Sequence, residues 1–390
     1  MSVPLNILLV GDYPEDERLG SAKVMHELRA QFTTLGHQCE TIFSPEIGGA
    51  ESRQIRQAIT PALAMAAIHR RSRSRPFDVV DVASAEGMWL GLARKLGRYS
   101  GTAYICRSHG LEQLNYQRML DDAAAGLAKK PWWKRVWYPV SRLSQVALAA
   151  RLADGLVVLT ERDWSYALSH SWQPPDRVTV IPHGLSDRFL TDPAPVSLSG
   201  GGGALFCGTW DHMKGIHYLV RAMDMLVERG CGIPLTVLGP GVPSSDVLSA
   251  FTERSRSLVT VIDRTDESRV REEYRRHDVL VFPSSYEGFG LVVIEAMSQG
   301  LPVIATPVGC AAALVRTGET GVQVPPRNAQ AIADAIAALM QSPDERRRLG
   351  ENAAKLVAEM SWRQTARQTL DFYGKTLARI RGLEQCQVYA

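Results

Sequence analysis

The feature that most limits the fold is an alternation of short apolar runs with amphipathic helical patterns, repeated along the 390 residues. In the first half the apolar runs are LNILLVGD (5–12), HQCETIF (37–43), FDVVDVAS (77–84), TAYICRSHG (102–110), DGLVVLT (154–160) and DRVTVIPHG (176–184). Apolar runs of this length separated by helices are typical of parallel strands joined by crossover connections. The pattern therefore predicts a doubly wound α/β domain.

A break rich in proline, serine and glycine, DPAPVSLSGGGG, separates this half from a second alternation. Its four consecutive glycines are too flexible for a core element, so we place a hinge at 192–203. We expect two Rossmann-like doubly wound domains, 1–191 and 204–361, facing across a cleft that collects the carboxyl ends of the strands. A last helix, within 362–390, is expected to pack back on the first domain.

Composition excludes several classes of protein. A net charge of +3 lacks the strong basic bias of a dedicated nucleic-acid binder. The six cysteines are scattered without metal-ligand spacing, which favours reduced thiols in a cytosolic protein. No segment has the roughly 18 uninterrupted apolar residues of a membrane-spanning helix. We expect a cytoplasmic chain, peripheral on the inner face of a membrane if it meets one.

The stretch SSYEGFGLVVIEAMSQG (284–300) places two glutamates around an apolar run. The pattern predicts a strand, a loop that contains Glu287 and a helix that contains Glu295. A helix N-terminus leaves unpaired N–H groups that attract an anion such as a diphosphate. Carboxylates repel phosphate, so both glutamates are better suited to accept hydrogen bonds from sugar hydroxyls. The alternative is that Glu287 is an ordinary loop carboxylate and that Glu295 is a surface residue of the helix.

Two further loops are candidates for anion binding. LFCGTWDHMKG places Lys214 between a strand and a helix, where a compact positive charge suits a phosphate, although an exposed lysine fits the pattern alone. In the first half, Gly20 precedes a helix without the full G-x-G-x-x-G spacing. A nicotinamide cofactor is therefore disfavoured, and a weak anion site at Gly20 remains open.

His109 ends the predicted strand TAYICRSHG, at the edge where ligand-contacting residues belong. Arg107 lies two residues earlier and should share its face of the strand. A histidine here can donate a hydrogen bond to a substrate or act in acid–base chemistry, and a structural histidine fits equally well.

The segment AKKPWWKRVWYPVSR (128–142) combines bases and aromatic residues without an acid. Its candidate membrane-contact residues are Lys129, Lys130, Trp132, Trp133, Lys134, Arg135 and Trp137. Bases with interfacial aromatics are typical of a membrane surface, while a helix packed by its tryptophans is nearly as compatible. The arginine run at 69–76 is expected to be a solvated turn that could extend a basic face.

Together these motifs resemble the retaining, nucleotide-sugar-dependent glycosyltransferases of family 4, which have the GT-B fold. The resemblance is strongest over 204–327, in CGTWDHMKG, the glutamate block and TGETGVQVPP, and FDVVDVAS, RSHG and VIPHG are similar to weaker markers of the first domain. It implies transfer of a hexosyl unit from a nucleotide sugar to an acceptor hydroxyl, which can be lipid-linked or part of a surface polysaccharide. It also implies no metal and no cofactor beyond the nucleotide-sugar co-substrate.

The resemblance assigns roles to matching positions. It implies that Glu295 binds the ribose, that Lys214 neutralises the diphosphate, and that His109 lies beside the transferred sugar. The remaining donor-binding positions that it implies are Thr209, Glu287, Gly288, Phe289, Gly290 and the N–H of Leu291. His109, Lys214 and Glu287 are thus the expected catalytic residues.

Three positions depart from the family pattern. Thr209 replaces a usual arginine, His183 a usual asparagine and Ala313 a usual glutamate. Thr209 and Ala313 leave open a non-catalytic sugar-nucleotide scaffold. Other activities on the same fold, a nucleotide-sugar epimerase or a sugar phosphorylase, also stay open. A glycoside hydrolase is least compatible, since its two carboxyls must flank one bond across a cleft.

Overall fold

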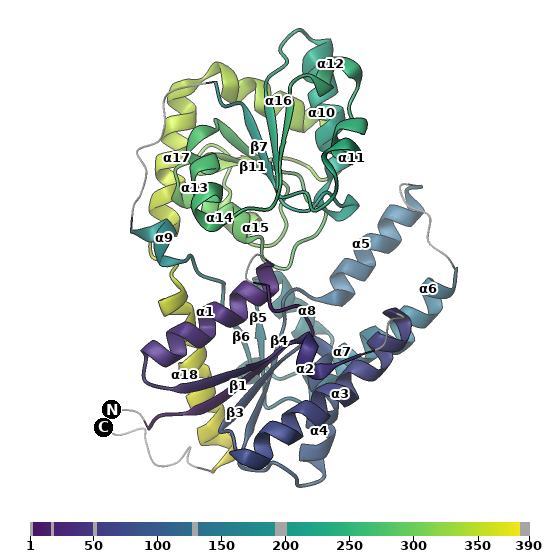
Figure 1. Ribbon diagram of the computed structural model, residues 1–390, viewed down its shortest axis with the longest axis vertical. Helices are drawn as coiled ribbons and strands as arrows, with labels where there is room; N and C mark the ends of the chain where they lie inside the picture. Colours follow the sequence, from purple (N-terminus) through teal and green to yellow (C-terminus); the bar gives the residue numbers. More distant parts are fainter. Residues whose placement is uncertain (1–2, 17–18, 50–52, 127–131, 192–200, 383–390) are drawn as a thin grey trace. The chain divides into compact units, whose positions relative to one another are not determined.

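The computed structural model describes residues 3–16, 19–49, 53–126, 132–191 and 201–382. The chain forms two compact units (Figure 1). Unit 1 comprises residues 1–183 and 362–390, and unit 2 comprises residues 184–361. Of the expected hinge, residues 192–200 lie outside the described part, so the hinge stays a prediction.

Unit 1 is built on a six-stranded parallel sheet of order β2-β1-β3-β4-β5-β6. Its strands are β1 (Asn6–Val10), β2 (Gln38–Ile42), β3 (Val79–Ala83), β4 (Ala103–Arg107), β5 (Gly155–Val158) and β6 (Val178–Val180). Strands β1, β3, β4 and β5 are buried along their whole length, which is why they read as continuous apolar runs. The predicted Rossmann-like first sheet is confirmed.

The helices of unit 1 cover both faces of this sheet and include the C-terminal helix (Figure 1). They are α1 (Gly20–Thr34), α2 (Ser44–Ile47), α3 (Arg53–Ser74), η1 (Ser84–Gly87), α4 (Met88–Lys95), α5 (Glu112–Ala124), α6 (Trp132–Tyr138), the π-helical turn η2 (Pro139–Leu143), α7 (Ser144–Leu152), α8 (Glu161–Ser169), η3 (Pro175–Arg177) and α18 (Trp362–Ile380).

The arginine run at 69–76 was expected to be a turn, and this prediction is wrong over most of its length. Helix α3 continues to Ser74, and Arg71 forms ion pairs with Glu40, at 2.8 Å, and with Glu46. Basic side chains are favoured in the last turn of a helix, where the partial charge is negative. The arginines therefore extend the helix instead of ending it.

Helix α18 packs against α1 and β4, which confirms that the C-terminal helix returns to the first domain. Its Tyr373 is fully buried, and the hydroxyl donates a hydrogen bond to Asp81 of β3. The same carboxylate oxygen accepts hydrogen bonds from Arg107 Nε, at 2.9 Å, and from a terminal nitrogen of Arg107, at 2.7 Å. A buried charge pair is tolerated only when it is fully hydrogen-bonded, and Tyr373 contributes to that here.

Unit 2 has a second six-stranded parallel sheet, of order β12-β11-β10-β7-β8-β9. Its strands are β7 (Ala204–Cys207), β8 (Leu235–Leu238), β9 (Val259–Ile262), β10 (Val279–Phe282), β11 (Val303–Ala305) and β12 (Gly321–Gln323). Its helices are α9 (Asp187–Leu190), η4 (His212–Lys214), α10 (Ile216–Glu228), α11 (Ser244–Ser249), α12 (Glu253–Arg256), α13 (Glu267–Arg276), α14 (Leu291–Ser298), α15 (Ala311–Leu314), α16 (Ala329–Gln341) and α17 (Pro343–Val357).

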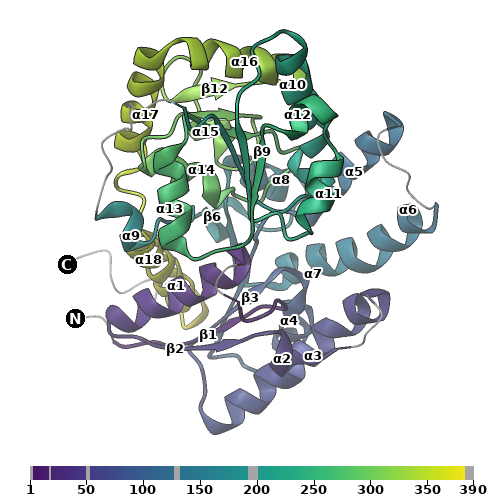
Figure 2. The same ribbon diagram turned by 45° about the horizontal axis from the view of Figure 1, so that its top comes forward.

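The strand order of unit 2 runs outward in both directions from the adjacent pair β7 and β10. Because crossover connections are right-handed, helices that follow these two strands lie on opposite faces of the sheet. Figure 2 shows this arrangement, in which α10 lies beside α16 while α14 lies between α13 and α17. Both sheets thus have the doubly wound topology that the sequence predicted.

Candidate active site

The reversal of strand order between β7 and β10 locates the candidate site. In open α/β sheets the loops after two such strands diverge and leave a crevice at their carboxyl ends. The loop after β7 carries Lys214, and the loop after β10 carries Glu287. The two residues singled out in the sequence therefore follow the two strands that flank the switch point of unit 2.

Lys214 and Glu287 form a close ion pair. The lysine Nζ lies 2.6 Å from Glu287 Oε1, and Ser284 Oγ donates a hydrogen bond of 2.8 Å to the same oxygen. Their side chains are 20% and 9% exposed, so the pair is screened only partly by water. An ammonium group has three N–H donors, and the contact with Glu287 uses one of them. A fixed cation with donor capacity is thus held at the crevice.

Close backbone contacts join the two loops behind this pair. Gly215 has φ of +72°, and a Cβ added there would lie 2.0 Å from the carbonyl oxygen of Pro283. Next to it, Ser285 N–H donates a 2.8 Å hydrogen bond to Met213 O. Only glycine fits the position, so the backbone that presents Lys214 is locked against the loop that presents Glu287.

A third loop, after β11, supports the glutamate loop from its other side. The N–H of Cys310 donates a 2.7 Å hydrogen bond to Phe289 O, and the Phe289 side chain is buried. At Gly309 a Cβ would lie 2.3 Å from that same oxygen and 3.0 Å from the Cβ of Glu287. Contacts from the backbone of the loop after β11 therefore hold residues 287–289 in place.

Helix α14 begins directly after the loop that contains Glu287. Gly290, with φ of +92°, precedes Leu291, the first residue of the helix, and Gly288 lies half-buried within the loop. The left-handed conformation of Gly290 is one that a larger residue adopts only with strain. The N–H groups of the first turn of α14 consequently emerge at the carboxyl edge of the sheet, beside Glu287.

Glu295 lies further along α14 and is 7% exposed. Tyr274 of α13 donates a 3.2 Å hydrogen bond to Glu295 Oε2, and its hydroxyl also lies 3.6 Å from the Sγ of Cys207, at the end of β7. The alternative that Glu295 is a surface helix residue is excluded by this burial. The hydrogen bond from Tyr274 fixes the carboxylate in one orientation.

The remaining donor-binding candidates are placed as follows. Thr209 is exposed in the loop after β7. Gly20 is exposed as the first residue of α1, in unit 1, where the preceding Leu19 supplies no side-chain cap. Ala313, which departs from the family pattern, is exposed in α15.

In unit 1, His109 lies half-buried just after β4. Its Nε2 is 2.8 Å from the hydroxyl of Tyr13, and its ring centroid lies 6.2 Å from that of His183, which is buried. Desolvation, with the nearby charge of Arg107, lowers the pKa of His109 to about 3. Desolvation likewise lowers the pKa of His183 well below its ordinary value. Both imidazoles are therefore neutral at physiological pH, and His109 is not a proton donor of the imidazolium type.

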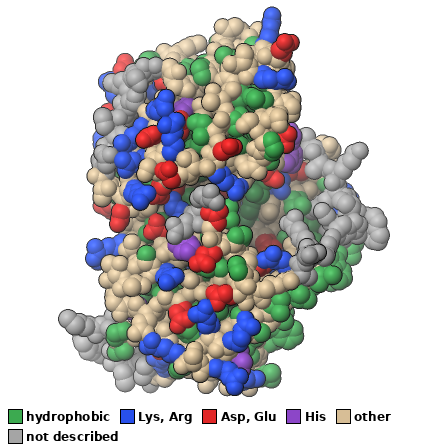
Figure 3. All heavy atoms as spheres, viewed as in Figure 1, with side chains coloured by type: hydrophobic (Ala, Val, Ile, Leu, Met, Phe, Trp, Pro, Cys, Tyr) green, Lys and Arg blue, Asp and Glu red, His purple; other side chains and the backbone are tan. Residues whose placement is uncertain are grey.

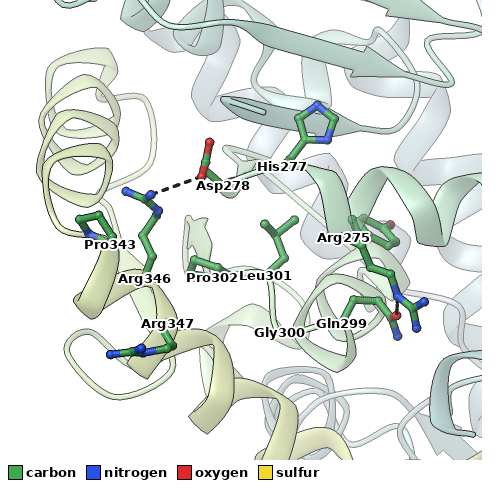
Figure 4. A pocket seen from close by; sticks show the side chains of 11 residues that line it. Arg275, His277, Asp278, Gln299, Gly300, Leu301, Pro302, Pro343, Arg346 and Arg347 are labelled. Atoms are coloured by element: carbon green, nitrogen blue, oxygen red, sulfur yellow. Dashed lines mark hydrogen bonds and ion pairs between the residues drawn. The ribbon is translucent and has the colours of Figure 1, made fainter. Parts of the chain in front are cut away.

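A small hollow in unit 2 lies at the amino ends of the strands, opposite the end that carries the candidate site (Figure 4). It is lined by residues around Asp278, which precedes β10, and around Pro302, which precedes β11. Its volume is about 20 Å³, and Arg346 reaches across to Asp278 at 3.3 Å. A hollow of this size accommodates about one water molecule, so it is not a sugar-nucleotide site.

Within the described residues no group of three or more histidine, cysteine, aspartate or glutamate side chains is arranged to hold a metal ion. In the same part of the chain no helix has the length and apolar character needed to cross a bilayer.

Sequence profiles of two glycosyltransferase families match the two halves of the chain. The profile described as "Glycosyltransferase Family 4" matches residues 19–188, and the one described as "Glycosyl transferases group 1" matches residues 200–356. The chain belongs to the family 4 glycosyltransferases. The resemblance inferred from the motifs is thereby confirmed.

Relatives of this family 4 glycosyltransferase include two D-inositol 3-phosphate glycosyltransferases. The protein from Corynebacterium urealyticum is 37% identical over 43% of this chain and 42% of its own length. The protein from Corynebacterium glutamicum is 30% identical over 58% of each chain. An α-D-kanosaminyltransferase from Streptomyces kanamyceticus is 28% identical over 64% of this chain and 65% of its own length. The matched segments thus span less than two thirds of these relatives.

Solved structures share the GT-B fold of the chain. Sucrose-phosphate synthase from Thermosynechococcus elongatus aligns with a TM-score of 0.78 and 21% identity, over 96% of this chain and 100% of that one. Anabaena HepE in complex with UDP-glucose aligns with a TM-score of 0.67 and 15% identity, over 95% and 100%. The predicted fold class is confirmed by these matches.

Sequence reasoning about this family 4 glycosyltransferase missed three side chains of the candidate sites. Ser284 and Tyr274 in unit 2, and Tyr13 in unit 1, each donate or share a hydrogen bond with a predicted residue. Ser284 and Tyr13 lie two and three residues after the apolar strands β10 and β1, which is a usable signal. Tyr274 lies within the charged helix ESRVREEYRRH, where nothing distinguishes it from a core aromatic.

The basic and aromatic segment is described only in part. Lys129 and Lys130 lie outside the described residues, as do the side chains of Trp132, Trp133 and Lys134. Arg135 and Trp137 are exposed on α6, Trp137 by 53%. For Trp137, the alternative of a buried packing residue is therefore excluded.

Proposed function

We propose that this protein transfers a hexosyl unit from a nucleotide-diphosphate sugar to an acceptor hydroxyl with retention of the α configuration. The observation that carries the proposal is the pairing of Lys214 with Glu287 at the switch point of unit 2, next to the N-terminus of α14. Membership of family 4 supports it. HepE, which shares the fold, has UDP-glucose as its bound ligand, so a UDP-sugar is the first donor to test.

The diphosphate is proposed to bind Lys214 and the N–H groups at the start of α14. Both supply positive charge where negative charge develops on the leaving group, and this kind of stabilisation is usually the largest single term in catalysis. Thr209, where the family usually has an arginine, contributes no charge, so the diphosphate depends mainly on Lys214. A lysine and a helix N-terminus would then supply what a metal ion supplies in other enzymes.

The sugar and the nucleoside are proposed to bind on either side of this diphosphate. Glu287, with the backbone of residues 288–290, would accept hydrogen bonds from hydroxyls of the transferred sugar. Glu295, oriented by Tyr274, would accept those of the ribose. The contacts of Glu287 with Lys214 and Ser284 fit this role, because they hold the carboxylate in one place as an acceptor.

The acceptor and the reacting sugar are proposed to meet unit 1 near His109. A neutral imidazole held by Tyr13 can donate or accept a hydrogen bond without bringing a charge close to the reacting centre. We assign no nucleophilic carboxylate. A reaction in which the leaving group departs and the acceptor attacks on the same face of the sugar needs none. Gly20 is kept as a candidate for contact with the donor. A lipid-linked acceptor and a cytoplasmic location are part of the proposal.

A thermal-shift screen with UDP-, GDP- and ADP-sugars tests donor binding, because a ligand that binds the native state raises Tm. We expect one nucleotide class to raise Tm of the wild type and to lose its effect on Glu295→Gln. Glu228→Gln, which changes an exposed glutamate of α10, is the matched control and should keep the shift. The absence of a shift with every nucleotide, from folded protein, would contradict the proposal.

Product analysis then tests the reaction class. A transferase releases nucleoside diphosphate only when it has an acceptor, apart from slow hydrolysis. Acceptor-independent isomerisation of the sugar nucleotide would instead identify an epimerase, and dependence on inorganic phosphate a phosphorylase. Donor binding without turnover, over a broad panel of hydroxyl acceptors, would favour a scaffold.

A further inference from the structure

Large hydrophobic side chains are exposed mainly on one group of helices in unit 1. Nine such side chains are exposed among the described residues, and seven of them lie on α3, α4 and the continuous α6–η2–α7 segment. The seven are Ile55, Ile59, Trp89, Val136, Trp137, Val140 and Leu148. Helix α4 contacts α3 and α7, and η2 contacts α3, so the three segments are neighbours. Figure 3 shows hydrophobic side chains gathered over this part of unit 1, at the lower right. We call this surface the apolar helical face.

The exposed positions follow the period of the helix. On α3, Ile55, Ile59, Ala62 and Ala66 are exposed at intervals of three or four residues. Along α6–η2–α7 the exposed residues include Val136, Val140, Ser144 and Leu148, each four apart. Residues at these intervals lie on one side of a helix, and on a surface helix the side turned to solvent is normally polar. Apart from Ser144, the positions named on these stripes are instead apolar where they face water.

The same segments contain no acidic residue. The chain has 41 aspartates and glutamates, yet none falls within 52–77, 87–111 or 123–153. The exposed bases on and next to these helices are Arg70, Arg73, Arg75, Lys95, Arg98, Arg135 and Arg151. An apolar stripe with bases and without acids is complementary to an apolar layer that lies beneath negative charge.

Two acids from neighbouring segments reach the helices from inside. Arg142 of η2 forms ion pairs with Glu86, at 2.9 Å, and with Glu112, at 2.8 Å. Tyr138 donates a 2.8 Å hydrogen bond to Glu112 as well. These contacts turn Arg142 inward and fix the α6–η2–α7 segment on unit 1. The apolar stripe is therefore held outward by a buried polar network on the other side of the same turn.

We propose that the apolar helical face docks on the surface of a lipid bilayer that contains anionic lipids. Trp89 and Trp137, which are 45% and 53% exposed, would lie at the level of the head groups, where tryptophan is favoured. The aliphatic side chains would enter the acyl boundary, and the bases would meet lipid phosphates. The described residues of the basic segment, on α6 and η2, are thus one part of a wider surface to which α3 and α4 contribute.

This inference goes beyond the proposed transfer reaction and does not depend on it. Membrane docking needs neither Lys214 nor Glu287, so the two proposals fail separately. A bilayer is favoured over a second copy of the chain because the face lacks acids. A copy with the same face would bring base against base.

Flotation with vesicles of phosphatidylcholine alone, or mixed equally with phosphatidylglycerol, tests the proposal on the full chain. We expect binding to the mixed vesicles that weakens with salt and with loss of the anionic lipid. Val140→Asp and Leu148→Asp should each lower the partition coefficient about tenfold, since each puts an acid into the stripe that docking would bury. Val3→Asp is the control, because Val3 is 80% exposed but lies outside the face. No binding to either vesicle would overturn the proposal.

Two further measurements cover misfolding and other occupants. Brominated lipid should quench part of the tryptophan fluorescence of the wild type, and Trp137→Phe, which preserves an aromatic ring, should remove part of that quenching. Unchanged quenching in both Trp137→Phe and Trp89→Phe would overturn the proposal. Sedimentation that reveals a dimer lost in Leu148→Asp, without vesicle binding, would reassign the face to a second copy.

Discussion

Lys214 Nζ lies 2.6 Å from Glu287 Oε1, although 73 positions separate the two residues in the chain. The contact joins the loops after β7 and β10, and it places a cation and an anion at the switch point of one sheet. A lysine in this position is neutralised until a ligand arrives. Glu287 therefore restrains Lys214, and a diphosphate would have to share the ammonium with it.

The first prediction separates the roles of this pair. Lys214→Ala should lower kcat by roughly 100- to 1,000-fold, in the range seen when one charge-stabilising donor is removed, and should also weaken binding of the nucleoside diphosphate. Glu287→Gln should lower kcat comparably while nucleoside diphosphate binds as well as before or more tightly, because Lys214 loses its competing anion. Turnover and calorimetry measure the two effects. Lys355→Ala, at an exposed position of α17, is the control. Weaker diphosphate binding in Glu287→Gln would contradict the assignment.

The second prediction concerns the support for the glutamate loop. Gly309→Ala should weaken donor binding and lower kcat by at least tenfold, because its Cβ would collide with Phe289 O and press on Glu287. Gly318→Ala is a matched control, since Gly318 also has positive φ, +78°, but a Cβ there meets nothing within 4 Å. Thermal shift with donor compares the two variants. Equal losses would mean that backbone strain alone, and not contact with the loop, explains the effect.

The third prediction tests the attachment of the C-terminal helix. Tyr373→Phe should destabilise the protein by about 1 to 3 kcal/mol, because Asp81 loses a buried hydrogen bond. Arg107→Met should cost more, about 3 to 5 kcal/mol, since it leaves the Asp81 carboxylate buried without its countercharge. Urea unfolding measures both. An Arg107→Met variant as stable as Tyr373→Phe would contradict a stabilising role for the buried pair of Arg107 and Asp81.

The fourth prediction is a loss of stability in acid. The pKa of His109 is about 3 in the fold, while an unfolded histidine titrates near pH 6.5. Between these values the unfolded chain binds a proton that the native chain does not, so the free energy of unfolding falls as pH drops from 6.5 toward 3. His183 adds to the same slope. Unfolding of His109→Gln between pH 7 and 4 should show a shallower decline than the wild type, and an unchanged slope would contradict the prediction.

In the fifth prediction the free energy of unfolding changes with pH in the opposite direction. Asp163 is buried in α8, and desolvation raises its pKa from 3.8 to about 6. Between pH 3.8 and about 6 the unfolded chain releases a proton that Asp163 keeps in the native chain, so the free energy of unfolding falls as pH rises through this range. Asp163→Asn should therefore stabilise the protein at pH 7 by about 2 to 3 kcal/mol and have little effect at pH 4. Asp344→Asn, at a fully solvated position, should change neither. A loss of stability at pH 7 would contradict the raised pKa.

Several features were predictable because they are local in the sequence. Buried parallel strands read as apolar runs, and the loop that holds Glu287 is bounded by such a strand and by a helix that ends at Ser298, two residues before Gly300. Lys214 was recognisable from its place between a strand and glycine. Family membership followed from the same blocks. Within each block the information lies in consecutive residues, and family membership rests on several such blocks together.

Other features could not be predicted because they depend on residues that are distant in the chain. The sequence contains Asp81, Arg107 and Tyr373, but it does not indicate that they share one buried hydrogen-bond network. The pKa of His109 depends on desolvation that only the packed fold creates. The run at 69–76 was misread as a turn because the acidic partners of Arg71 come from other elements.

The sequence by itself determined the order of strands and helices, the glycine positions and the residue types available for chemistry, since these follow from local pattern and backbone preference. The tertiary structure decided which of those residues meet. It set Lys214 against Glu287, turned Arg142 inward and left the apolar stripes of α3 and α7 outward. The physical reason is that burial and charge pairing depend on distances in space. Those distances are set by which strands lie side by side in a sheet, and this differs from their order along the chain.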